Sequence, residues 1–324
     1  MTIKTDPLVT VIIPVYNADP YLRTALDSVL DQTYENLQII IVDDGSTDNG
    51  MDTINGVLDH RVTIFRQANS GKSIAMNLAL RQAKGKYYAV QDADDVSAPQ
   101  RIEKLVDIME NAPHIGAVFS GYDLLLNKIR FAPICLEKDE DTCQKLTEQI
   151  KMPSHDPTGF YRMEMVRGIK YDPELKIGQG FDYILRVGEK FPMQVVANCL
   201  YTYRIGRSSI IRTDINHRAL MVKRVWEKAC KRRKTDYDAW LVHNRGRLSS
   251  LQRGTRMYGV VSHCLESVVC LKSAGRFADA LKVGLQCCKI NVFNLEYYKP
   301  LLYSLVPLDL LYLYRNLKKR YKST

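Results

Sequence analysis

Three aspartates close together in the sequence could bind a divalent cation. Asp92, Asp94 and Asp95 closely follow a short, mainly apolar run, residues 86–90, and Gly85 separates that run from a preceding helical segment. Three carboxylates this close cannot all be ionised at low cost, because like charges raise one another's pKa. Mg²⁺ or Mn²⁺ would relieve this repulsion, since both ions prefer oxygen ligands and are often bound together with substrate phosphates. Alternatively, one of the three only caps the helix expected to begin near Pro99.

The elements that position these aspartates are the strands of an α/β sheet. β-branched runs at residues 8–17 and 37–48 predict two further strands that end in polar groups. Amphipathic spacing over residues 19–30 predicts a crossover helix, and residues 62–65 form a third strand in chain order. The βαβαβ order predicts a parallel, doubly wound sheet, whose strands end at one ligand-binding edge. Between the second and third strands we expect a polar helix that buries Met51, Ile54, Val57 and Leu58.

The order and spacing of four motifs resemble the family 2 glycosyltransferases of the GT-A fold. The motifs are residues 8–17, 37–48, 69–77 and 92–95, and the resemblance fades after about Arg212. It implies a Rossmann-like, mostly parallel sheet with flanking helices, and helical spacing of apolar residues after residue 216 predicts a small α-helical C-terminal domain. We expect the GT-A domain at residues 1–215, with its nucleotide-sugar half at about 1–98 and its acceptor half at about 99–215. A helical domain at 216–299 and an amphipathic basic tail at 300–324 complete the predicted organisation.

Tyr16 and Asp44 are the residues that we expect to contact a nucleotide base. A uracil ring offers a face for stacking and an imide N–H for a carboxylate, and the ends of two adjacent strands could supply both. Tyr16 could instead be a rim aromatic, and Asp44 could form an Asx-turn before Gly45. The resemblance places Pro14 and Asn17 in the same nucleotide-sugar site.

Residues 69–73, with the sequence Asn-Ser-Gly-Lys-Ser, look like the end of a phosphate-binding loop. The earlier glycine of that loop is missing, because Arg66 stands in its place, so we reject a P-loop. A glycine turn that opens a helix can still present backbone N–H groups and Lys72 to a diphosphate. The resemblance supports this use of Lys72.

The resemblance also assigns the cation. It implies that Asp92 and Asp94 form the Asp-x-Asp pair that holds Mn²⁺ or Mg²⁺ and the sugar nucleotide, with Asp94 as the first candidate for direct metal contact. Arg204 lies in a Tyr-Arg segment that resembles the end of the family's domain, and could cover the diphosphate or only anchor a loop.

The catalytic base is where this sequence departs from the family's pattern. An inverting transferase needs a carboxylate that takes the proton of the acceptor hydroxyl. Aligning the chain on Arg186 puts Gly180 where the usual aspartate would stand. We take Asp182 as the predicted base, although an ion pair with Arg186 would explain it equally well, and Asp156 is the alternative. The neighbouring His155 could touch the acceptor or the metal, or be purely structural.

Charge and composition indicate the partners. The formal net charge of +10 is concentrated after residue 216, with 22 Lys and Arg against 7 Asp and Glu in residues 217–324. No nucleic-acid-binding signature accompanies this charge, so we expect no nucleic acid partner. The apolar and then basic residues 300–324 could contact an anionic membrane or close the C-terminal domain. Eight cysteines without a metal-binding pattern and an N-terminus without signal-peptide features predict free thiols and a cytoplasmic location, at the inner face of the plasma membrane if the tail binds lipid.

The sequence therefore predicts a metal-dependent, inverting hexosyltransferase. It would move a sugar from a nucleotide-sugar donor, a UDP-sugar in the first instance, to a hydroxyl of a glycan or lipid-linked acceptor in polysaccharide or cell-envelope synthesis. Gly180 keeps one alternative open, a catalytically weak sugar-nucleotide-binding or assembly protein of the same fold.

Overall fold

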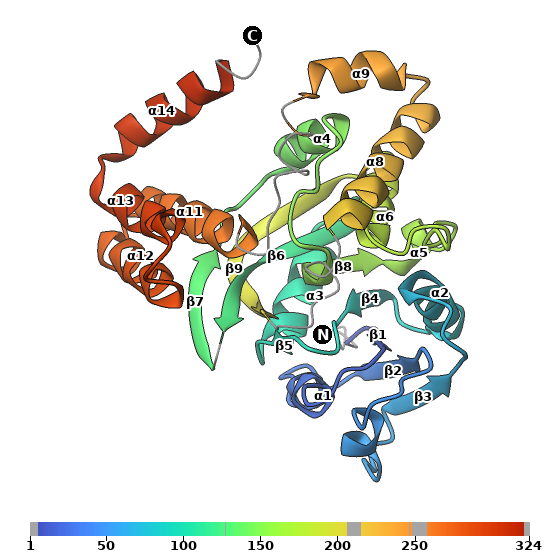
Figure 1. Cartoon of the computed structure of the whole chain (residues 1–324). Coiled ribbons are helices and arrows are strands. Elements are labelled where there is room, and N and C mark those ends of the chain that lie inside the picture. The colour runs from blue at the N-terminus through green and yellow to red at the C-terminus, as the bar shows by residue number, and fades with distance from the viewer. Residues whose placement is uncertain (1–5, 127, 206–214, 246, 248–257, 321–324) are drawn as a thin grey trace. The chain divides into compact units, whose positions relative to one another are not determined.

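The chain divides into two compact units (Figure 1). The computed structural model describes residues 6–126, 128–205, 215–245, 247 and 258–320. The first unit comprises Met1–Tyr122 and Cys135–Arg204, and the second comprises Asp123–Ile134 and Ile205–Thr324. The segment Asp123–Ile134 thus groups with the C-terminal helices, which the predicted boundary at residue 215 did not anticipate.

Four parallel strands carry the first motifs. They are β1 (Val9–Val15), β2 (Leu37–Asp43), β3 (Val62–Arg66) and β4 (Tyr87–Val90), in the spatial order β3-β2-β1-β4. Helices α1 (Leu22–Leu30) and α2 (Lys72–Gln82) connect them, and only a 3₁₀ turn, η1 (Met51–Ile54), lies between β2 and β3. The predicted polar helix there is therefore wrong. Met51 and Ile54 are buried, but Leu58 is 99% exposed, because the turn ends before reaching it.

The remaining strands include antiparallel pairs, so the sheet is mixed. Strands β8 (Gly159–Arg162), β6 (Ala117–Leu126), β9 (Met193–Arg204) and β5 (Val96–Ser97) continue the order after β4, and β7 (Ile129–Ile134) pairs with β6. β8 lies antiparallel to both β4 and β6, and β5 lies antiparallel to β9. Helices α3 (Arg101–Asn111), α4 (Glu140–Glu148), α5 (Met163–Val166) and α6 (Gln179–Gly188), with the 3₁₀ turn η2 (Asp156–Thr158), complete the first unit.

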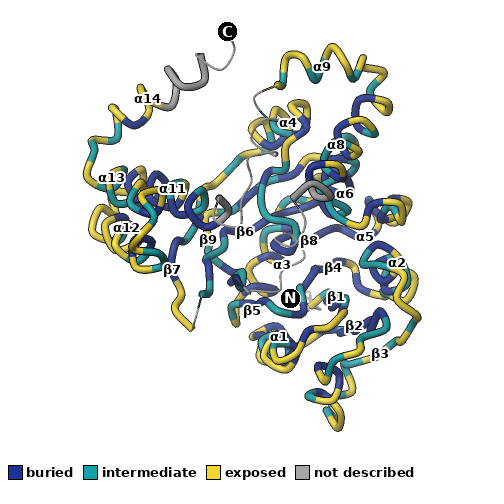
Figure 2. Tube along the Cα trace, in the orientation of Figure 1, coloured by how far each residue is buried: buried dark blue, intermediate teal, exposed yellow. Residues whose placement is uncertain are grey.

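Alternating side chains of the strands build two cores, one on each face of the sheet. Ile13 and Ile41 pack with Leu26 of α1 and with α3, whereas Ile12 and Ile40 pack with α2 and α6. Figure 2 shows the central strands β4 and β8 as continuously buried. Each such aliphatic side chain contributes about 1.5 to 3 kcal/mol by leaving water. This two-faced burial holds the strand ends rigidly where the polar motifs begin.

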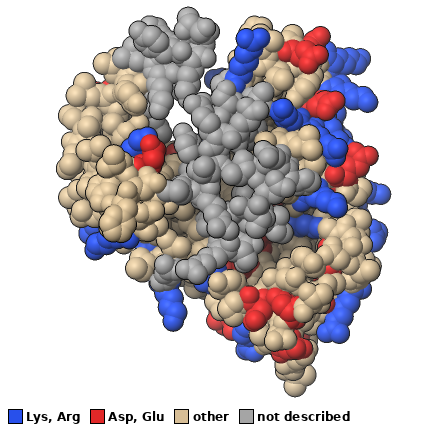
Figure 3. Space-filling model, in the orientation of Figure 1, with Lys and Arg blue, Asp and Glu red and all other residues tan. Residues whose placement is uncertain are grey.

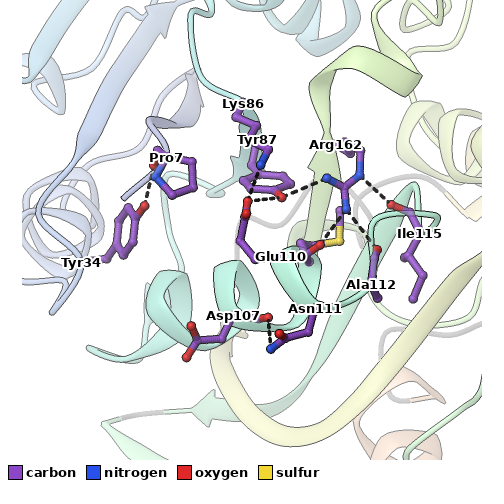
Figure 4. Close-up of polar contacts among 11 residues, drawn as sticks. Pro7, Tyr34, Lys86, Tyr87, Asp107, Glu110, Asn111, Ala112, Ile115 and Arg162 are labelled. Atoms are coloured by element: carbon purple, nitrogen blue, oxygen red, sulfur yellow. Dashed lines mark hydrogen bonds and ion pairs between the residues drawn. The ribbon is translucent and has the colours of Figure 1, made fainter. Parts of the chain in front are cut away.

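A buried arginine at the end of β8 fixes that strand to the end of α3 (Figure 4). The Arg162 guanidinium donates to the carbonyl oxygens of Met109, Ala112 and Ile115 and to the Tyr87 hydroxyl, at 2.7 to 3.1 Å. The Tyr87 hydroxyl in turn donates to Glu110 at 2.6 Å. Because these partners are carbonyls at the end of a helix and an adjacent strand residue, Arg162 sets the position of β8 relative to β4.

The second unit is helical. Its elements are α8 (Ile215–Arg232), α9 (Tyr237–His243), α11 (Tyr258–Ser273), α12 (Phe277–Ile290), η3 (Leu295–Tyr298), α13 (Lys299–Leu305) and α14 (Leu308–Arg320). Residues 274–276 separate α11 from α12. The buried Lys272 of α11 donates to the carbonyls of Tyr303, Ser304 and Val306 and so caps the end of α13. Within the described residues, no helix is both long and apolar enough to cross a membrane.

The cysteines of the chain are thiols and not disulfides. All eight cysteines are free thiols, as predicted, and six of them are buried. Burial raises the pKa of the Cys143 thiol to about 11, which keeps it protonated and unreactive at neutral pH.

Candidate active site

The aspartates after β4 meet a lysine from α2. Lys72 Nζ lies 2.6 Å from Asp92 Oδ1, and the Asp92 N–H donates to the Tyr201 hydroxyl at 3.1 Å. Burial opposes the charge on Lys72, but the carboxylates of Asp92, Asp156 and Asp94 together raise its pKa above the usual lysine value. Lys72 is therefore a permanent cation at the edge where the parallel strands end.

Asp94 is half-buried, and its charge is poorly compensated. Burial, and then the like charge of Asp92, raise the pKa of Asp94 to about 6, although Lys72 and Arg204 oppose the shift. A carboxylate held in this state gains from an additional cation. Mg²⁺ and Mn²⁺ need only one or two protein carboxylates when substrate phosphates complete their coordination, so Asp94 and Asp92 fit such an ion. Among the described residues, no group of three or more His, Cys, Asp or Glu side chains could form a metal site by itself.

Asp95 holds the end of β9 against the aspartate loop. It is completely buried, and its Oδ1 accepts from the Arg204 N–H at 2.8 Å, while Arg204 Nε donates to the Asp94 carbonyl at 2.7 Å. The Arg204 guanidinium also lies 4.5 Å from the centre of the Tyr21 ring. These contacts tie the end of β9 to the aspartate loop and bring Arg204 beside Asp94. The N-cap of α3 is Gln100, so none of the three aspartates caps that helix.

Asp44 supports the loop that carries Lys72. Its Oδ1 accepts from Gln67 Nε2 at 2.7 Å and from the Ser70 N–H at 2.8 Å, and its Oδ2 accepts from the Gly71 N–H at 2.8 Å. The side chain is 3% exposed. The turn at Gly45 is instead supported by Asp43, whose Oδ1 accepts from the Ser46 N–H, three residues on, at 2.9 Å. A contact between Asp44 and a base stays a prediction, and it would have to share oxygens that already accept three hydrogen bonds.

The end of β1 presents one exposed aromatic residue. Tyr16 is 44% exposed, so its ring is accessible for stacking. Asn17 has a left-handed backbone (φ 52°), and its Oδ1 accepts from the Thr47 N–H at 2.8 Å, which joins the loops after β1 and β2. Pro14 lies within β1 opposite Val42 of β2. Tyr16 and Asn17 are both exposed, whereas Pro14 is partly buried, and Asn17 also holds the surrounding loops.

The predicted base, Asp182, lies on the first turn of α6 and is committed to an ion pair. Its Oδ2 accepts from Arg186 Nε at 2.8 Å, and the residue is 1% exposed. Asp156, in η2, and His155, the residue before it, have pKa values that burial shifts. Burial raises the pKa of Asp156 to about 6 and lowers the pKa of His155 to about 4, and both groups interact electrostatically with Asp92 and Lys72. The imidazole is thus neutral at pH 7 and packs between the rings of Tyr122 and Tyr203, at 5.0 and 4.7 Å between ring centres.

Comparison with known proteins identifies the family. The family model described as glycosyl transferase family 2 matches residues 10–165. A putative teichuronic acid biosynthesis glycosyltransferase of Bacillus subtilis strain 168, TuaG, is 32% identical over 215 residues, which cover 63% of this chain and 81% of that protein. The chain belongs to glycosyltransferase family 2. Uncharacterised glycosyltransferases of Haemophilus influenzae and Rickettsia felis are each 40% identical over 125 residues, which span 39% and 21% of their lengths, respectively.

Solved structures show the same fold. Staphylococcus aureus TarS 1–349 in complex with UDP-GlcNAc has a TM-score of 0.60 and 16% identity, over 86% of this chain and 83% of that one. The mannosyltransferase PcManGT of Pyrobaculum calidifontis, in complex with GDP-Man and Mn²⁺, has a TM-score of 0.56 and 18% identity, over 93% and 86%. The predicted GT-A fold of this family 2 glycosyltransferase is therefore confirmed.

Proposed function

We propose that this chain is a metal-dependent hexosyltransferase that moves a sugar from a nucleotide sugar to an acceptor hydroxyl with inversion at the anomeric carbon. The observation that carries the proposal is the pair Asp92 and Asp94 beside Lys72 at the end of the parallel strands. Family membership supports the reaction class, and the neighbours that hold UDP-GlcNAc or GDP-Man with Mn²⁺ support a nucleotide-sugar donor and a cation. A UDP-sugar is the donor that we propose first.

Different residues would bind the cation, the diphosphate and the base of the donor. Asp94, with Asp92, would hold Mn²⁺ or Mg²⁺, which supplies positive charge beside the diphosphate when bound. Lys72 and the N–H groups at the start of α2 would bind phosphate oxygens, and Arg204, whose Nε contacts the Asp94 carbonyl, would pair with them as well. Tyr16 would stack on the base. The buried site lowers the effective dielectric, so these charges act more strongly on the departing diphosphate than they would in water.

Nucleoside diphosphate release from a panel of UDP- and GDP-sugars, with and without Mn²⁺, tests this function. We expect one donor to be turned over only with the cation, and Asp94→Asn to lower the rate by about 100-fold or more, as losing an electrostatic stabiliser does. Asp107→Asn, an exposed carboxylate on α3, is the matched control and should leave the rate unchanged. Metal-dependent UDP binding without any turnover would favour the non-catalytic alternative, and no binding of any nucleotide would refute the proposal.

We further propose that the acceptor is a glycan or lipid-linked precursor of the cell envelope, used at an anionic membrane surface. The relative TuaG, a putative teichuronic acid biosynthesis glycosyltransferase, supports a polysaccharide acceptor. Exposed leucines on α13 and α14 support the membrane contact, with Leu302 at 59%, Leu305 at 65% and Leu313 at 56% exposed. The face drawn in Figure 3 is largely uncharged over α11, α12 and α13.

A further inference from the structure

The carboxyl group of Asp156 fills the space that a side chain at position 180 would need. A Cβ added to Gly180 would overlap the Oδ2, Cγ and Oδ1 atoms of Asp156, all closer than the 3.0 Å below which real Cβ atoms are essentially never found. Gly180 lies in the first turn of α6 and has an ordinary helical backbone, so conformational freedom does not explain the glycine. The glycine is instead required because another residue's carboxyl group lies against its Cα atom.

This overlap explains why the chain has a glycine at position 180, where the family's pattern has an aspartate. Alignment on Arg186 puts Gly180 where the family's base aspartate would stand. We propose that Asp156 is the general base of this enzyme and that it delivers from η2 the carboxylate that position 180 lacks. The inference rests on the proposed glycosyl transfer, and it replaces Asp182 in the mechanism.

The backbone that carries Asp156 is fixed to the donor side of the site. The completely buried Arg101 donates from Nη2 to the carbonyl of Pro157 at 2.7 Å and to that of Val90 at 3.1 Å. Val90 is the last residue of β4, immediately before the aspartate loop. Thr158 Oγ1 closes the η2 turn by donating to the carbonyl of His155 at 2.6 Å. One guanidinium thus holds the end of the donor strand and the Asp156 segment in a constant relation, as a base needs.

The chemical environment of Asp156 suits a proton acceptor. Its Oδ1 is buried and has no hydrogen-bond partner among the residues that the structure describes, whereas Asp182 is paired with Arg186. Burial and the charge of Asp92 raise the pKa of Asp156 to about 6, and Lys72 lowers it. The other titratable groups that interact with it are the buried hydroxyls of Tyr161, Tyr171 and Tyr183, whose pKa values are all raised by burial, so they stay neutral. At pH 7 to 8 the carboxylate is ionised, yet more basic than an exposed aspartate.

The step that Asp156 would assist is a single displacement. The acceptor oxygen forms a bond to the anomeric carbon of the donor sugar, on the face opposite the diphosphate. The bond from that carbon to the diphosphate oxygen breaks, and its electron pair leaves with the nucleoside diphosphate. The proton of the acceptor hydroxyl passes to a carboxylate oxygen of Asp156 and later to water, so the reaction needs no further reactant.

Asp156→Asn tests the assignment, because it preserves the shape of the side chain and removes its basicity. With the donor found in the panel above, and water as acceptor, we expect kcat for diphosphate release to fall by about 10² to 10⁴-fold. The affinity for UDP with Mn²⁺, measured by calorimetry, should stay within about threefold of wild type. The acid limb of the wild-type pH profile, near pH 6 and recorded with saturating Mn²⁺ so that Asp94 stays ionised, should disappear from the residual activity. The double variant Asp156→Ala/Gly180→Asp should regain at least tenfold over Asp156→Ala, since it returns a carboxylate to the same space.

Asp182→Asn serves as the matched control, because Asp182 lies on the same helix turn as Gly180. It should keep the acid limb and most of kcat. The assignment is overturned if Asp156→Asn turns over within threefold of wild type, if it loses UDP binding in parallel with turnover, or if Asp182→Asn abolishes the acid limb. Turnover by wild type together with any of these results would leave the proposed function standing, whereas a wild type that neither binds nor hydrolyses a nucleotide sugar would remove both.

Discussion

Gly180→Ala should inactivate the enzyme while leaving it folded. The added methyl group overlaps the Asp156 carboxyl group, which must move by more than about 1 Å to reach ordinary van der Waals contact, between 3.4 and 4 Å. A displacement of about 1 Å at a reacting group costs on the order of 10² in rate, which corresponds to about 2.7 kcal/mol in the activation free energy. We therefore expect kcat to fall by about 100-fold.

The same substitution should change stability little. Alanine is better than glycine in a helix by up to about 1 kcal/mol, while overpacking a buried site costs about 1 to 3 kcal/mol. These effects oppose each other, so we expect the Tm to fall by only a few degrees. Steady-state kinetics of diphosphate release, UDP calorimetry and a thermal melt of the same preparation measure the three quantities.

Gly168→Ala is the matched control for Gly180→Ala. Gly168 also belongs to the first unit, but a Cβ there would meet no atom within 4 Å. Its kcat should equal that of wild type. If Gly180→Ala keeps the wild-type rate, the carboxyl group does not need its position against α6, and the reasoning fails. If Gly180→Ala fails to fold, the Asp156→Asn variant still decides the role of the carboxylate.

Three further substitutions test other parts of the structure. Arg162→Met removes the guanidinium that donates to the buried carbonyls of Met109 and Ile115, so it should cost about 3 kcal/mol and lower the Tm by about 6 to 12 °C in a thermal melt; an unchanged Tm would mean that β8 is held by other contacts. Asp44→Ala removes the acceptor of the Ser70 and Gly71 N–H groups, so calorimetry should show UDP binding weakened by about tenfold or more, whereas equal affinity would mean that Lys72 is positioned independently. Replacing Leu302, Leu305 and Leu313 by serine should abolish co-sedimentation with vesicles of anionic phospholipid without lowering the Tm, because all three are exposed; a deletion would be less clean, since Lys272 binds the end of α13. Co-sedimentation equal to wild type would count against the membrane contact.

The sequence predicts the parallel half of the fold because burial there depends on a local pattern. β1, β2 and β4 are mostly apolar or β-branched, and each ends near the polar residues that the motifs contain. The rest of the sheet, which includes antiparallel pairs, has no such signature. β5 is two residues long, and its pairing with β9 joins Val96 to Thr202, so only the folded chain specifies it. The inward orientation expected for Leu58 failed for a similar reason, since a polar segment with helical spacing needs a surface to pack against.

The candidate site shows the same division between local and tertiary information. The types and spacing of Asp92, Asp94 and Lys72 predict a cluster at one edge of the sheet, and the structure brings Lys72 and Asp92 together. The separate role of Asp95 could not be predicted, because it depends on the Arg204 N–H, 109 residues away. Asp44 likewise uses its oxygens on residues 67–71, a loop whose approach depends on β2 and β3 being neighbours.

Gly180 and Asp156 together point to the catalytic base, but neither residue does so by itself. At position 180, a glycine in place of a carboxylate indicates the loss of a base. At position 156, an aspartate before a proline reads as the start of a turn, which it also is. Only the packing of η2 against α6 shows that one position makes the room that the other occupies. A substitution that removes a carboxylate therefore does not by itself argue for a non-catalytic protein, because a second position can return the same group to the same space, and the double variant at 156 and 180 tests that equivalence directly.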